Sequence, residues 1–210
     1  MTDDLMCDFS IEACALGVLS AFYYYSYAIL QIPVGLGIDK FGPTLLLRGA
    51  TILCITGTTF FALSESFYLA CFSRLLIGAG ATCAFLGSLK LATNWFPPER
   101  LALVVGCTLL AGKAGACLGQ GPLALIMNAM GWRQTLLYVI LPLGVVLTGG
   151  LWTFVKDTPP TGSLGPISLK HPTLKKLLNN LKSILANYNI WIFALYGALM
   201  YVPISAFADL

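Results

Sequence analysis

Charge is scarce in this 210-residue sequence. Only 10% of its residues are charged and 58% are hydrophobic, whereas soluble domains average about 25% charged and about 45–50% apolar residues. This scarcity excludes an ordinary soluble globular domain. The charged residues are clustered, so long apolar runs lie between them, and about 20 apolar residues are enough to cross the hydrocarbon core of a membrane. The composition therefore predicts a chain that crosses a membrane several times.

Several kinds of chemistry lack the residues that they need. His171 is the only histidine and the seven cysteines form no CxxC pair, so we expect no metal site and no cofactor. The P-loop pattern GxxxxGK[ST] is absent, and so are paired carboxylates within the apolar runs that an intramembrane enzyme would need. A net charge of +3 without a basic, aromatic-rich patch gives no sign of a nucleic-acid partner. We therefore expect a chain that is not an enzyme.

The apolar runs have the length of membrane-spanning helices. They predict an all-α, multi-pass helical bundle over residues 13–155, followed by the start of another transmembrane helix at 189–210. The links within the bundle are short, which makes consecutive helices antiparallel neighbours. The predicted spans are about 13–38, 44–63, 67–93, 101–127 and 134–155.

Basic residues are distributed unevenly between the two sets of alternate loops. Lysine and arginine are retained on the cytoplasmic side of a membrane, so the loop set that is rich in them should be cytoplasmic. Residues 1–12 are then an extracytoplasmic segment and residues 156–188 a cytoplasmic linker. The other loop set contains only Arg133, while the basic set contains Lys40, Arg48, Lys90, Arg100, Lys156, Lys170, Lys175, Lys176 and Lys182.

Leucines recur at helical spacing in the cytoplasmic linker, with the lysines largely off their stripe. One interpretation is an amphipathic helix that lies on anionic membrane lipid, which would make lipid a partner of the chain. An ordinary amphipathic helix packed against protein fits the pattern equally well. The leucines are Leu174, Leu177, Leu178, Leu181 and Leu185.

The turn after the first span carries the most specific motif, GLGIDKFGP from Gly35 to Pro43. Its pattern Gly-x-x-x-Asp-(Arg/Lys)-x-Gly resembles the signature loop between the second and third helices of the major facilitator superfamily. Pro43 and Thr44 stand where that family often has two basic residues. Other stretches resemble the same family in the same order, over roughly residues 13–156: RLLIGAGA from Arg74, NWFPPERLALVVG from Asn94 and GWR from Gly131.

The resemblance implies most of the N-terminal half of a secondary transporter, truncated at both ends, in a bacterial-type inner (plasma) membrane. Such transporters work by alternating access, and the missing C-terminal half would be the partner of this chain. The resemblance also implies that the cytoplasmic turns take part in conformational gating, through Gly35, Asp39, Lys40, Gly42 and Arg100.

Asp39 and the two glycines of this turn have a physical reason for such a role. Gly35 and Gly42 allow two backbones to approach closely, and Asp39 would pair with a basic group or a helix N-terminus of the opposite half. The alternative is a mere turn with a solvated charge pair.

Two basic residues, Arg74 and Lys113, lie inside apolar runs, where a charge costs about 2.5–3.5 kcal/mol on insertion scales. Lys113 lies near the midplane, about 18 Å into its span at 1.5 Å per residue. Both are candidates for binding a carboxylate or another anionic group. The alternatives are an internal ion pair of Lys113 with the missing half and partial snorkelling of Arg74. Lys90 is close enough to the inner surface that we expect it to snorkel.

Tyr24, Tyr27 and Gln31 share one face of the first span, at i, i+3 and i+7, near mid-depth. Polar groups at this depth need partners or water. These side chains either line a central cavity and contact substrate or form hydrogen bonds between helices.

Together these features predict secondary active transport of a small organic solute, with carboxylates, amino acids and short peptides favoured. Symport and antiport both remain open. A proton is the expected coupling ion, although no acidic residue lies in the middle of a span. The alternative function is a non-transporting fragment or an assembly partner of a larger transporter.

Overall fold

The computed structural model of the chain describes residues 2–9, 11–157 and 186–208, and these contain helices and no β-strand. The chain divides into two compact units, residues 1–169 and 170–210. The leucine stripe of the linker, at 174–185, lies outside the described residues. In the second unit, α10 (Tyr188–Ala208) is an apolar helix without a charged residue.

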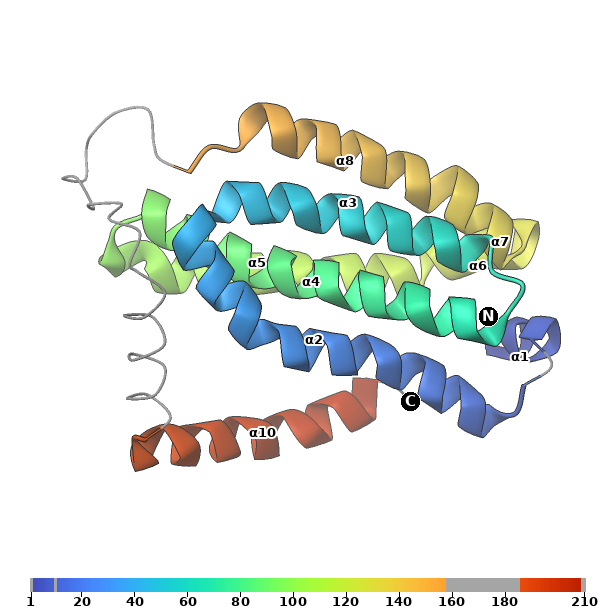
Figure 1. The fold of residues 1–210 in the computed structure, drawn as a ribbon, viewed down its shortest axis with the longest axis horizontal. Helices are drawn as coiled ribbons and strands as arrows, with labels where there is room; N and C mark the ends of the chain where they lie inside the picture. The colour runs from blue at the N-terminus through green and yellow to red at the C-terminus, as the bar shows by residue number, and fades with distance from the viewer. Residues whose placement is uncertain (1, 10, 158–185, 209–210) are drawn as a thin grey trace. The chain divides into compact units, whose positions relative to one another are not determined.

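The first unit is a bundle of long helices that run alongside one another (Figure 1). Five segments are long and apolar enough to cross a membrane, which confirms the predicted all-α, multi-pass fold. A short helix, α1 (Thr2–Phe9), precedes them. The first three segments are α2 (Ala13–Phe41), α3 (Pro43–Ala62) and α4 (Phe67–Trp95).

The two remaining segments of the bundle are interrupted. The run expected at 101–127 consists of α5 (Pro98–Gln120) and α6 (Pro122–Met130), which Gly121 separates. Pro122 has no N–H to donate and so cannot continue α5. The last segment joins α7 (Trp132–Thr135), one π-helical turn η1 (Leu136–Ile140) and α8 (Leu141–Phe154). Such π turns inside α-helices are rare and are frequent at functional sites.

Single glycines reverse the chain at two connections. Gly42 separates α2 from α3, and Gly131 separates α6 from α7, with φ angles of 86° and 84°. A side chain is strained at such angles, whereas glycine adopts them readily. The turn that contains Asp39 and Gly42 and the turn that contains Glu65 lie at opposite ends of α3, and they are called the Asp39 end and the Glu65 end below.

Helix α4 packs closely against both α2 and α3 because small residues line the contact. Thr82 Oγ1 also donates a hydrogen bond across it to the carbonyl of Tyr27 on α2, at 3.2 Å. Small residues at helix contacts let backbones approach within membranes. Three glycines of α4 have no room for a methyl group: Gly78 against Ser26 and Tyr23, Gly80 against Cys54 and Ala50, and Gly87 against Leu47.

We expect Gly78→Ala to lower the thermal midpoint of the purified protein. The new methyl group would overlap the hydroxyl of Ser26 and the carbonyl of Tyr23, and overpacking of this kind costs about 1–3 kcal/mol. The buried, free cysteines of α4 allow a thiol-reactive fluorophore to report unfolding.

Gly49→Ala in α3 is the matched control, because an added Cβ there meets nothing within 4 Å. Its midpoint should stay equal or rise, since alanine favours a helix by about 1 kcal/mol over glycine. If Gly78→Ala and Gly49→Ala had the same thermal midpoint, the proposed tight contact between α2 and α4 would be wrong.

Candidate functional site

Arg74 is a partly buried charged side chain within the bundle. It lies in α4, about 10 Å from the first residue of the helix at 1.5 Å per residue. Its guanidinium carbon is 4.6 Å from the ring centroid of Phe61 on α3. Its Nε atom is buried and has no hydrogen-bond partner among the described residues. A buried donor that lacks a partner is costly, so Arg74 offers an anion a favourable contact.

Two of the tyrosines of α2 lie near this arginine. Tyr23 and Tyr24 are within electrostatic range of the Arg74 guanidinium. Tyr23 stacks on Tyr27, with ring centroids 6.1 Å apart, and meets Tyr24 edge-on at 5.2 Å. Tyr23 was not predicted as a site residue together with Tyr24, Tyr27 and Gln31. Its i, i+4 spacing to Tyr27 places the two side chains on one face of the helix and was the signal that could have identified it. Gln31 is exposed on α2.

Lys113 lies near the middle of the segment Pro98–Met130, on a helix that has no buried residue. Its side chain is exposed and makes no hydrogen bond or ion pair with the part of the chain that the structure describes. Arg74 is therefore within electrostatic range of Tyr24, and among the described residues neither of them has a hydrogen bond or ion pair with Lys113.

At the Asp39 end, Asp39 forms an ion pair within the same bundle. Lys90 Nζ on α4 donates to Asp39 Oδ1 at 2.8 Å, and both side chains remain partly exposed. Lys90, which was expected to snorkel to the membrane surface, has Asp39 as a partner. Asp39 was expected to pair with the opposite half, which stays a prediction, and within this chain Lys90 of α4 is one partner. The pair restrains the end of α2 against α4.

The other residues assigned to gating lie around this ion pair. Gly35 lines a shallow groove between α2 and α4 together with Asp39 and Lys90. Lys40 is exposed, with its Nζ 4.9 Å from the centroid of the Phe41 ring. Arg100 is exposed in the first turn of α5.

Asp157, which the sequence did not single out, ties the end of α8 to its neighbours. Asp157 Oδ1 accepts a hydrogen bond from the Thr44 N–H at 2.8 Å, and so occupies the N-terminus of α3. The Trp95 indole donates to the Lys156 carbonyl at 2.9 Å, and the Asn94 amide donates to the Asp157 carbonyl at 3.4 Å. A carboxylate at a helix N-terminus satisfies free N–H groups and the helix dipole. These contacts, called the 156–157 clasp, hold α3, α4 and α8 together.

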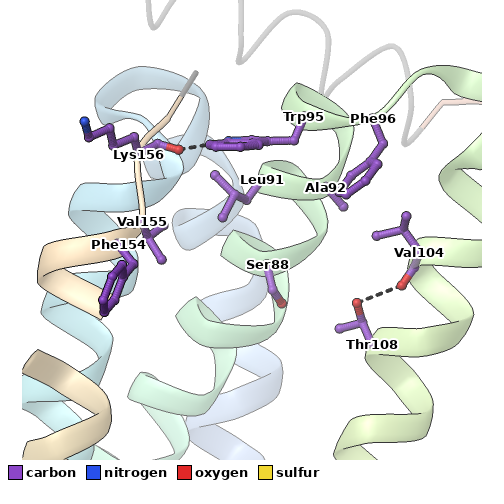
Figure 2. A pocket seen from close by; sticks show the side chains of 10 residues that line it. All are labelled: Ser88, Leu91, Ala92, Trp95, Phe96, Val104, Thr108, Phe154, Val155 and Lys156. Atoms are coloured by element: carbon purple, nitrogen blue, oxygen red, sulfur yellow. Dashed lines mark hydrogen bonds between the residues drawn. The ribbon is translucent and has the colours of Figure 1, made fainter. Parts of the chain in front are cut away.

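A crevice of about 310 Å³ opens beside the 156–157 clasp. Figure 2 shows that aromatic and aliphatic side chains dominate its walls and that the Lys156 side chain points away from it. Thr108 donates to the carbonyl of Val104, and Ser88 donates to carbonyls of its own helix. Because no charged group is directed into this crevice, it is a poor site for an anion.

Comparison with known proteins identifies a family. The family model of the Major Facilitator Superfamily matches residues 2–209. The chain is also similar to several curated transporters, and it spans only about a third of the length of the three named next.

These three relatives are bacterial. The uncharacterized transporter YybO of Bacillus subtilis is 28% identical over 71% of this chain and 34% of its own length. The hexuronate transporter of the same species is 25% identical over 72% of this chain and 36% of its own length. A protein named "Probable sulfoacetate transporter SauU", of Cupriavidus necator, is 27% identical over 72% of this chain and 35% of its own length.

We expect Asp157→Ala to lower the thermal midpoint, because the Thr44 N–H loses its acceptor. Loss of a capping side chain costs about 1 kcal/mol. Asp157→Asn keeps an acceptor oxygen of the same shape without the charge, so its loss should be smaller. The thiol-fluorophore melting assay measures both variants. Wild-type midpoints in both would show that the hydrogen bond between Asp157 and the Thr44 N–H does not stabilise the bundle.

Proposed function

The chain belongs to the Major Facilitator Superfamily, and from this membership we propose that it forms a substrate-binding part of a secondary transporter for small organic anions. Its family makes it an integral, multi-pass membrane protein of a transporter family rather than an enzyme. The bacterial relatives support a location in the plasma membrane. The observation that carries the proposal is the enclosed guanidinium of Arg74, which has an unpartnered Nε among the described residues.

A carboxylate is the substrate group that this site fits. Arginine presents a planar set of donors that binds carboxylates in a bidentate manner. Two relatives are named for hexuronate and sulfoacetate, and both of these compounds carry a carboxylate. Tyr24 and Tyr23, within electrostatic range of Arg74, add hydroxyl groups that can bind the polar remainder of such a solute.

We assign Lys113 as the second cation of the site. Its ammonium group has no hydrogen bond or ion pair with a described residue, and it lies near the middle of its span. A charge at that depth is costly unless it is paired. In the complete transporter, an anionic substrate would supply the missing partner. Tyr27 and Gln31, on the same face of α2 as Tyr24, would line the remainder of the cavity.

Alternating access supplies the mechanism. The Asp39–Lys90 ion pair and the glycine turn at Gly42 would act at the cytoplasmic end of the bundle, where the basic loops lie. Lys40 and Arg100, exposed at that end, are available to a complementary C-terminal half, and Gly35 allows a close approach.

A proton gradient is the proposed energy source. The acidic residues of the sequence lie at or beyond helix ends rather than within the spans. A carboxylate that carries the coupled proton through the membrane would therefore belong to another part of the complete transporter.

A second candidate function is that of an assembly partner without transport activity of its own. It is favoured by α5, none of whose residues is buried. Such a surface suits a second chain as well as the other half of a transporter.

Lys113→Ala and Arg74→Gln should each abolish saturable uptake of galacturonate by cells that make the complete gene product. Removing a charged hydrogen-bond partner costs about 1.5–3 kcal/mol, which corresponds to a roughly 10- to 150-fold weaker interaction. Radiolabelled galacturonate and galactose form the matched probe pair, because they differ in the carboxylate. Galactose uptake should be negligible in every variant.

Lys156→Ala is the control, since Lys156 follows α8 and is not one of the residues assigned to the proposed site. It should transport like the wild type. Membrane insertion of each variant is verified by fractionation. Undiminished uptake by Lys113→Ala would remove Lys113 from the site, and undiminished uptake by Arg74→Gln would refute the proposed anion site. If the wild type itself does not transport carboxylates, the assembly-partner function becomes the better proposal.

A further inference from the structure

Four side chains form a continuous column of cations and aromatic rings that leads from the Glu65 end to the proposed anion site. The Arg133 guanidinium lies 4.7 Å from the centroid of the Trp132 ring. Trp132 is in turn 5.6 Å from the ring of Phe61, and Phe61 is 4.6 Å from the guanidinium of Arg74. These four residues, here called the cation–aromatic column, come from α7, α3 and α4.

The outer members of the column are fixed by polar contacts. Trp132 donates from its indole to Asp8 Oδ2 at 2.9 Å, and Arg133 Nε approaches the same oxygen at 3.3 Å. Arg133 also donates to the Ala62 carbonyl at 3.5 Å, next to Phe61 in the chain. Trp132 is 4% exposed and Phe61 is 3% exposed. The Phe61 ring therefore has little freedom to turn.

The contact between Phe61 and Arg74 leaves the N–H donors of the arginine free. A ring that lies under a guanidinium attracts the cation by its quadrupole and uses no N–H donor. The planar donor edge of Arg74 therefore stays available, and its Nε has no partner among the residues described. Phe61 thus restrains the arginine without consuming the groups that would bind an anion.

We propose that Phe61 is the positioning residue of the anion site: its ring holds the Arg74 guanidinium in the orientation that receives a carboxylate. The inference rests on the proposed function, because it assigns to Arg74 the binding of the anion. Trp132 and Asp8 act through Phe61 by keeping its ring in place. Binding of the anion therefore depends on the electron-rich face of this ring. An apolar side chain of similar volume would not hold the Arg74 guanidinium in this orientation.

Graded fluorination tests this dependence without changing the shape of the ring. Mono-, di- and trifluorophenylalanine are introduced at position 61 of the complete gene product by nonsense suppression, with the same series at Phe60 as the matched control. Phe60 is the neighbouring residue on α3, and no described cation lies over its ring. Each added fluorine weakens the attraction of the ring for a cation.

Two measurements are made on each protein in nanodiscs. The first is the rate at which phenylglyoxal modifies Arg74, followed by peptide mass spectrometry without ligand. The second is the dissociation constant for galacturonate. We expect both to rise stepwise along the Phe61 series, reaching about three- to tenfold for the trifluorinated ring, and to stay constant along the Phe60 series.

The outcomes separate this inference from the proposed function. If Arg74→Gln abolishes galacturonate binding while the Phe61 series changes neither quantity, the positioning role is wrong and the anion site stands. If the modification rate rises along the series but Arg74→Gln binds galacturonate normally, the ring restrains Arg74 and the anion site is wrong. Phe61→Leu, which keeps an apolar side chain without a π face, should weaken binding as the trifluorinated ring does. Wild-type binding by that variant would also overturn the proposal.

Discussion

The close approach of α4 to α2 and α3 is the constraint on which the rest of the bundle depends. Within lipid, apolar surface alone does not drive helices together, so packing of small residues and hydrogen bonds between helices must do so. Gly78, Gly80 and Gly87 provide the packing, and Thr82 provides a hydrogen bond to α2. A larger side chain at these glycines would separate the helices that form the proposed site.

This contact also determines where the charges lie. Arg74 stands one turn before Gly78 and two turns before Thr82, on the helix face that meets its neighbours. Its guanidinium is therefore enclosed by α2 and α3 and reaches the Phe61 ring. Lys90 lies at the far end of the same helix, where it meets Asp39. The packing of α4 against its neighbours thus places Arg74 near one end of this helix and the Lys90–Asp39 ion pair near the other end.

The sequence predicted the fold class well because membrane spans are encoded by local composition. Apolar length and the glycine turn at Gly42 are properties of short stretches, and the structure confirms a multi-pass helical bundle. Contacts between helices are not local. Phe61 and Asp157 have no distinguishing neighbours in the sequence, and Trp132 stands out only as part of the motif GWR. Only packing reveals that Phe61 meets Arg74, that Trp132 meets Phe61 and that Asp157 meets Thr44. The break at Gly121 was missed because Pro122 was read as part of one long apolar run.

The two intramembrane cations differ in a way that suits a transporter. The Arg74 guanidinium is restrained by a buried ring, whereas the flexible Lys113 ammonium is exposed on α5. A restrained planar donor set selects the geometry of a carboxylate, and a mobile point charge adds attraction without demanding one geometry. In our proposal, the first cation recognises the substrate and the second can follow it as the cavity changes shape. Tight binding by two rigid cations would instead oppose release, which each transport cycle requires.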